Sequence, residues 1–271
     1  MKEDILSVPT VKPPFLVRLK RGVRKNPEYI LSPLILILLL LFTEYLFKYL
    51  NVPTWIIPRP SIILKALVKN FIIIYLPEVK LTLIELLVGY ALGVVFGIAL
   101  AAIISQYHVL EKIVTPYILL IAVTPMIVLV PLLILWLGFS ISVRIIVVFV
   151  ASFPPVMMNS ITGYSNVGEL RLDLMKSLGA SQWQTFSKVK FLSGLPTTFT
   201  GVTLAAIISL ITVVGAEFLG GSFGLGYLII YYSSLLQTPM VFGAIVILVI
   251  VGISFYLGIS WLKNRIVRWT E

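Results

Sequence analysis

The stretch SNVGELRLDLMKSLGASQWQTFSKVKFLSGLP, residues 165–196, decides how this sequence is interpreted, because it is polar and lies between apolar segments. The flanking segments 142–164 and 197–219 each have the length and apolar content of a membrane helix, which needs about 20 residues. A membrane protein rarely keeps so long a loop ordered unless the loop contacts something. We therefore treat 165–196 as the first candidate functional site.

Composition indicates an integral membrane protein. Of the 271 residues, 59% are hydrophobic and 12% are charged, whereas soluble domains carry about 25% charged residues. The mean hydropathy is +1.06. Six segments are long and apolar enough to span a bilayer, and they predict an all-α protein of the cell membrane with six transmembrane helices: 31–50, 81–105, 113–137, 142–164, 197–219 and 240–262.

Two connections between spans carry helices of their own. No charged residue occurs from 218 to 262, yet this run is too long for one span, and its glycines and Pro239 predict a break with a short re-entrant or surface helix. After Arg59-Pro60, residues 61–75 predict a short helix at the outer surface, with Ser61 as its N-cap.

The distribution of Lys and Arg predicts the orientation. Fifteen of the 21 basic residues fall in 1–30, in the loop between spans two and three, in 165–196 and after residue 262. These segments alternate onto one side, which the positive-inside rule places in the cytoplasm. Both termini are then cytoplasmic: a tail at 1–30, an outer segment at 51–80, a core at 81–262 and a tail at 263–271. The net charge of +10 therefore reflects topology and not binding to nucleic acid.

Several kinds of chemistry are not expected from this composition. With no cysteine and the single His108, the sequence predicts no metal site and no cofactor in this chain. A P-loop string G-x-x-x-x-G-K-[ST] does not occur in the sequence, so no P-loop ATP site is expected within it. Glu44, Glu85 and Glu217 lie near span ends without forming a relay, which argues against a proton-coupled transporter and a membrane-bound enzyme.

Two further patterns lie inside the spans. Gly89, Gly93, Gly97 and Ala101 recur four residues apart and predict a face for close helix packing, although a sliding or path-lining face would look the same. Prolines are frequent in spans three and four and predict kinks. The Thr124-Pro125-Met126 region is therefore a candidate for the translocation pathway, with plain helix packing as the alternative.

The 165–196 loop predicts two helices with a break between them. Asn166 and Glu169 have the spacing of a capping pair, and Gly179 is placed to end the first helix. Ser181 and Gln184 predict a second capping box. An apolar stripe at Leu170, Leu174 and Leu178 suits either a helix on the membrane surface or a docking site for a soluble partner.

Several strings resemble, in order, the permeases of binding-protein-dependent ABC importers, with the nitrate/sulfonate/taurine branch as the most similar. They are IPRPSIILKAL (57–67), TPMIVLVPLLILWLGF (124–139), FPPVMMNSITG (153–163) and AEFLGGSFGLGYLI (216–229). In the EAA motif of that family, Asp173 takes the Glu position and Gly179 the Gly position. Leu174 and Met175 replace the two small residues, and Leu192 replaces a proline.

The resemblance implies a non-enzymatic permease with no catalytic residue, in which 165–196 is the cytoplasmic coupling loop between spans four and five. Two copies would form the pore for a nitrate-, sulfonate- or taurine-like anion or a related solute. Two ATP-binding subunits, holding ATP and Mg, would dock beneath, and an extracytoplasmic solute-binding protein would deliver the cargo. An ATP-independent secondary transporter or channel remains the alternative.

The resemblance also implies roles for particular residues. Docking to the ATP-binding subunit is implied for Asp173, Leu178, Gly179, Ala180, Ser181 and Trp183. A place on the translocation pathway is implied for Thr124, Pro125, Met126, Val213, Val214 and Glu217. For Glu217 the alternative is a residue at the span end that bonds to loop backbone.

Overall fold

The computed structural model describes residues 28–268, and every regular element in that part of the chain is helical. Five helices are long and apolar enough to cross a membrane, or six if one bent pair counts as a single span. This confirms the predicted all-α membrane protein. The predicted tails at 1–30 and 263–271 lie partly outside the described residues, and the chain divides into two compact units, 1–61 and 62–271.

In the first unit, helix α2 (Glu28–Tyr49) covers the first predicted span. The Glu44 carboxylate accepts hydrogen bonds from the Ser61 amide at 2.9 Å and from the Ser61 hydroxyl at 2.8 Å. Helix α3 (Pro60–Asn70) begins at a proline, whose fixed φ suits a first helical position, and so already includes Ser61. The prediction that Ser61 is the N-cap of this helix is therefore wrong.

The second predicted span is helical well before residue 81. A π-helical turn, η1 (Phe71–Tyr75), joins α3 to α4 (Leu76–Ile104). Pro77 follows directly and has no amide hydrogen to donate to the preceding turn, which accounts for a change of helix type at this point.

The third predicted span is wrong as a single helix over 113–137. Helix α5 (His108–Val123) and helix α6 (Met126–Leu137) meet at 88°. Thr124 has φ −72° and ψ 120°, the extended conformation that a following proline imposes. Pro125 therefore breaks the helix, where a mild kink was expected.

The core of the second unit is built around α7 (Ile141–Ser165), which packs along both α4 and α10 (Phe191–Gly220). A Cβ atom on Gly89 would lie 2.7 Å from the Val148 Cβ, and one on Gly97 would lie 2.8 Å from the Phe153 carbonyl oxygen. The four-residue spacing of small residues thus lets α4 and α7 approach at backbone distance.

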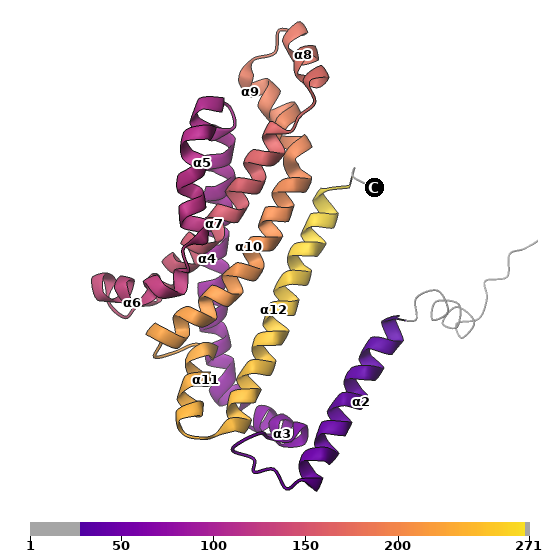
Figure 1. Ribbon diagram of the computed structural model, residues 1–271, viewed down its shortest axis with the longest axis vertical. Helices are drawn as coiled ribbons and strands as arrows, with labels where there is room; N and C mark the ends of the chain where they lie inside the picture. Colours follow the sequence, from indigo (N-terminus) through magenta and orange to yellow (C-terminus); the bar gives the residue numbers. More distant parts are fainter. Residues whose placement is uncertain (1–27, 269–271) are drawn as a thin grey trace, which may run out of the picture. The chain divides into compact units, whose positions relative to one another are not determined.

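Helix α11 (Leu225–Ser234) lies in the predicted break between the last two spans, and α12 (Thr238–Ile266) follows it. Figure 1 shows the start of α5 and the end of α12 at the same end of this unit as helices α8 (Glu169–Ser177) and α9 (Gln182–Thr185), with α3 and α11 at the opposite end. Helix α4 therefore runs toward the end that holds α8 and α9, and α10 runs back toward the end that holds α11.

Candidate functional site

The long polar loop forms a helical elbow, which we define as residues 166–190. Its first helix, α8, ends in two nested hydrogen bonds. The Gly179 amide donates to the Lys176 carbonyl at 2.9 Å, and the Ala180 amide donates to the Met175 carbonyl at 3.0 Å. Gly179 has φ +66°, a left-handed conformation that glycine adopts without strain. The predicted helix stop at Gly179 is confirmed.

The two predicted caps of the elbow have different outcomes. The capping box at Ser181 and Gln184 is confirmed. The Ser181 amide donates to the Gln184 side-chain oxygen at 2.8 Å, and the Gln184 amide donates to the Ser181 hydroxyl at 3.2 Å. The pair at Asn166 and Glu169 is wrong, because α8 begins after Gly168 and has no side-chain cap.

The second half of the elbow continues into the membrane helix without a break. Helix α9 passes through a π-helical turn, η2 (Phe186–Lys190), directly into α10. Pro196, the last residue of the 165–196 stretch, lies inside α10, whose preceding residues already run as helix. The second half of the elbow and α10 therefore share one continuous helical backbone.

The elbow exposes apolar side chains. Leu170 is 86% exposed, Leu174 60%, Leu178 71% and Trp183 70%. Asp173 is exposed beside them and pairs with Lys176 at 3.0 Å. Apolar side chains gathered on a polar loop are typical of a surface that binds a partner.

Two polar contacts hold the elbow to neighbouring helices, and a third holds the adjoining end of α7. The Arg171 guanidinium contacts the Ser193 hydroxyl at 3.2 Å, and the Lys190 ammonium contacts the Ser105 carbonyl, at the end of α4, at 3.4 Å. The Ser165 hydroxyl donates to the Glu111 carboxylate of α5 at 3.2 Å. The elbow thus has a fixed base and an exposed outer surface.

A cavity of about 560 Å³ lies at the bend between α5 and α6, bounded also by α7 and α10. The predicted pathway residues Thr124, Pro125 and Met126 all line it. Its other polar side chains are Asn159 and Thr212, and no charged side chain of the described residues lines it. It is a largely apolar chamber with a few groups that can form hydrogen bonds.

The remaining predicted pathway residues lie elsewhere. Val214 lines a neighbouring cavity of about 390 Å³ with Gly215 and Phe218. Val213 and Glu217 are 0% exposed and are packed within the bundle.

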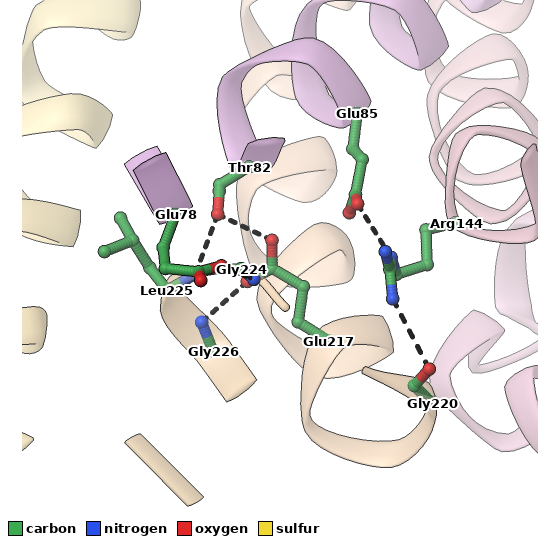
Figure 2. Close-up of polar contacts among 9 residues, drawn as sticks. All are labelled: Glu78, Thr82, Glu85, Arg144, Glu217, Gly220, Gly224, Leu225 and Gly226. Carbon is green, nitrogen blue, oxygen red and sulfur yellow. Dashed lines mark hydrogen bonds and ion pairs between the residues drawn. The ribbon is translucent and has the colours of Figure 1, made fainter. Parts of the chain in front are cut away.

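Glu217 belongs to a buried polar cluster that anchors α11 (Figure 2). Its carboxylate accepts hydrogen bonds from the Thr82 hydroxyl (2.6 Å) and the Gly226 amide (2.6 Å), and Thr82 accepts one from the Leu225 amide (2.9 Å). The Glu78 carboxylate accepts from the Gly224 amide. Acceptors on α4 and α10 therefore satisfy the amides at the start of α11, which have no partner inside the helix.

The same region contains a buried ion pair that sequence reasoning missed. The Arg144 guanidinium lies 2.8 Å from the Glu85 carboxylate and also contacts the Gly220 carbonyl at 3.4 Å (Figure 2). Its guanidinium carbon lies 3.9 Å from the centre of the Phe223 ring. The available signal was the presence of two opposite charges within apolar segments, since such charges usually pair.

Comparisons with known proteins agree with these features. The family model described as "Binding-protein-dependent transport system inner membrane component" matches residues 93–270. The formylaminopyrimidine transport permease protein ThiX of Halalkalibacterium halodurans is 27% identical, over 92% of this chain and 99% of its own. The taurine transport system permease protein TauC of Escherichia coli is 27% identical, over 69% of this chain and 68% of its own.

A solved structure shares the fold. The bacterial alginate ABC transporter, in complex with an alginate pentasaccharide-bound periplasmic protein, contains a chain with a TM-score of 0.60 and 14% identity. The match covers 92% of this chain and 98% of that one. With a family model that matches most of its length and permease relatives over nearly all of it, this chain belongs to the family of inner membrane components of binding-protein-dependent transport systems.

Proposed function

We propose that this chain is the membrane permease subunit of an ATP-driven importer and that its 166–190 elbow docks an ATP-binding subunit. The family is one of inner membrane components, and the apolar helices place the chain in the cell membrane as a multi-pass protein. The work of transport then needs a partner that hydrolyses ATP, with ATP and Mg held on that partner.

The observation that carries the proposal is the contrast between the base of the elbow and its surface. The elbow is held to α10 and to the end of α4, and the adjoining end of α7 is held to α5, while Leu170, Leu174, Leu178 and Trp183 are exposed. An elbow lying on the bilayer would need no such anchoring, whereas an elbow that receives force from a partner would. We assign docking to Asp173, Leu178, Gly179, Ala180, Ser181 and Trp183. The bulk of Leu174 and Met175 calls for a wide groove in the partner.

The proposed arrangement has both termini and the elbow in the cytoplasm, with α3 and α11 on the outer side. Two copies of the chain form the pore around a two-fold axis, and each takes one ATP-binding subunit. A solute-binding protein delivers the cargo from outside. The periplasmic protein bound to the alginate transporter supports this last partner by analogy of fold.

The cavity at the α5–α6 bend is the proposed stretch of the pathway, with Thr124, Pro125 and Met126 at its walls and Val214 in the neighbouring cavity. Val213 and Glu217 would act indirectly, by holding α10 and α11 in place. The cargo is a small solute, and a nitrate-, sulfonate- or taurine-like anion is one candidate class. Relatives that transport taurine and formylaminopyrimidine show that the family carries chemically different molecules.

A secondary transporter is less well supported. Such proteins rely on ionisable groups that bind and release a coupling ion. Among the described residues, Glu85 pairs with Arg144 and Glu217 caps α11, so both serve structural contacts. That class also gives no reason for an anchored elbow.

The test is purification of the tagged full-length chain from native membranes in mild detergent. We expect an ATP-binding subunit to co-purify and to be lost in Gly179→Asp. Aspartate is among the residues that best tolerate a left-handed conformation, so this change places a charge in the interface without unfolding the elbow.

Gly168→Asp is the matched control. It introduces the same charge in the same loop, at a position where no atom lies within 4 Å of an added Cβ, and aspartate is a good N-cap for α8. We expect it to retain the ATP-binding subunit. Absence of any ATP-binding protein from the wild-type preparation, or its retention by Gly179→Asp, would contradict the proposal.

A further inference from the structure

We propose that Phe186 and Tyr164 are positioning residues that transmit the movement of the elbow into α7, the central helix of the bundle. This inference rests on the proposed function and goes beyond it, because the docking residues alone leave open how a push on the second half of the elbow reaches α7. The chain joins α7 to the elbow only through the non-helical residues 166–168.

The rings form a chain from the exposed surface to the interior. Trp183 stacks on Phe186 with ring centres 5.7 Å apart, and Phe186 meets the Tyr164 ring edge-on at 5.3 Å. Phe191 completes the group at 5.9 Å from Tyr164. Trp183 is 70% exposed, whereas Phe186 is 4% and Tyr164 0% exposed. The group therefore joins the docking surface to the core in two steps.

The backbone on both sides of the rings is tightly packed. Phe186 opens the π-helical turn η2, and such turns inside helices are frequent at functional sites. Beside it, a Cβ on Gly163 of α7 would lie 2.7 Å from the Gly194 carbonyl oxygen of α10. A side chain in this region has no room to yield, so displacement of Phe186 displaces Tyr164.

The Tyr164 hydroxyl is buried and lies near the hydroxyls of Ser160 on α7 and Thr198 on α10. The contact with Phe186, and through it with Trp183, is made by the Tyr164 ring and not by this hydroxyl. This gives a sharp expectation: Tyr164→Phe keeps the link, while loss of a ring at either position removes it.

The two core helices receive the movement by different routes. Helix α10 is continuous with the elbow through α9 and η2, so it follows the elbow whether or not the rings are present. Helix α7 ends at Ser165, on the other side of the elbow, and its ring contact with the second half of the elbow is made through Tyr164. Because α7 also packs along α10, loss of Phe186 should reduce the movement of α7 while leaving that of α10 unchanged.

The experiment uses spin labels, which this cysteine-free chain accepts at single engineered sites. Thr162→Cys reports on α7 and Thr200→Cys on α10, and both positions are exposed. Labelled permease is assembled with its ATP-binding subunit, and the distance between the two copies is measured before and after trapping with ATP and vanadate. In the wild-type background we expect both distances to shift.

In Phe186→Ala we expect the α10 shift to remain and the α7 shift to become smaller than in the wild type, with the ATP-binding subunit still bound. If Phe186→Ala does not fold, Tyr164→Leu removes the other ring and tests the same link. Two variants should keep both shifts. Tyr164→Phe retains the ring, and Phe255→Ala removes a ring from the Tyr90–Phe255 pair, 5.0 Å apart, away from the elbow.

The outcomes separate the two proposals. Equal α7 shifts in wild type and in a folded ring-deletion variant would overturn the role of the rings and leave the proposed function intact. Loss of both shifts in the variant would also overturn it, because the rings would then support the elbow as a whole. Failure of the wild-type chain to bind an ATP-binding subunit, or to shift at either site, would contradict the proposed function itself.

Discussion

At the scale of single residues, the ion pair between Glu85 and Arg144 shows what a sequence conceals. The two residues are far apart in the chain and lie near span ends, so each alone looks like an ordinary charge at the membrane boundary. In the structure both side chains are buried, and the Arg144 Nε atom lies 2.8 Å from the Glu85 Oε1 atom. Only the packing of α4 against α7 creates this contact, and no local pattern encodes it.

A double-mutant cycle tests this pair. Arg144→Met leaves the Glu85 carboxylate buried without a counter-charge, and we expect it to lower the free energy of unfolding by about 3–5 kcal/mol. The double variant Glu85→Leu with Arg144→Met should be more stable than Arg144→Met alone, because no charge remains unpaired. Denaturant unfolding in detergent measures the free energy of unfolding of the wild type, of each single variant and of the double variant. Simple additivity of the two single changes would show that the residues do not interact.

At the scale of elements, patterns of apolar length and of helix-breaking residues predicted most of the fold. Apolar runs located the membrane helices, Gly179 located the end of α8, and the Ser181–Gln184 box located the start of α9. The 88° bend at Thr124-Pro125 was predicted only as a kink, because the angle depends on what α6 packs against. The π-helical turns have no simple sequence signature.

The candidate site was predicted unevenly for a similar reason. The elbow is local in sequence, so its helices and its exposed leucines could be inferred from spacing. For Glu217 a bond to backbone beyond the span end could be inferred as an alternative to a pathway role. Its partners Thr82 and Gly226 could not be named, because they come from another helix and from the start of α11. Residues whose function depends on contacts between distant segments need the structure to be interpreted.

The sidedness of the elements can be tested by labelling introduced cysteines, since the chain contains none. Ser177→Cys, at the end of α8, should react with a membrane-impermeant maleimide only when the cytoplasmic side is open. Ser233→Cys, in α11, should react in intact cells. Both positions are exposed, and the expectation follows from the distribution of basic residues. Reaction of both cysteines from one side would contradict the proposed topology.

At the scale of the whole molecule, the features fit the proposed permease, whose energy would come from a separate ATP-binding subunit. The second unit is a bundle around α7, with an anchored apolar elbow at one end and a carboxylate-capped hairpin, α10–α11, at the other. Between them lies an uncharged cavity lined by Thr124 and Asn159. The family supplies the class of protein, and the geometry indicates where force would enter and where a solute would pass.

The central claim is that this chain works with an ATP-binding subunit at the elbow. Native mass spectrometry of the wild-type complex, released from mild detergent, tests it most directly. The account predicts a particle with two copies of this chain and two copies of an ATP-binding protein. A folded particle that contains this chain alone, and no ATP-binding protein, would contradict it.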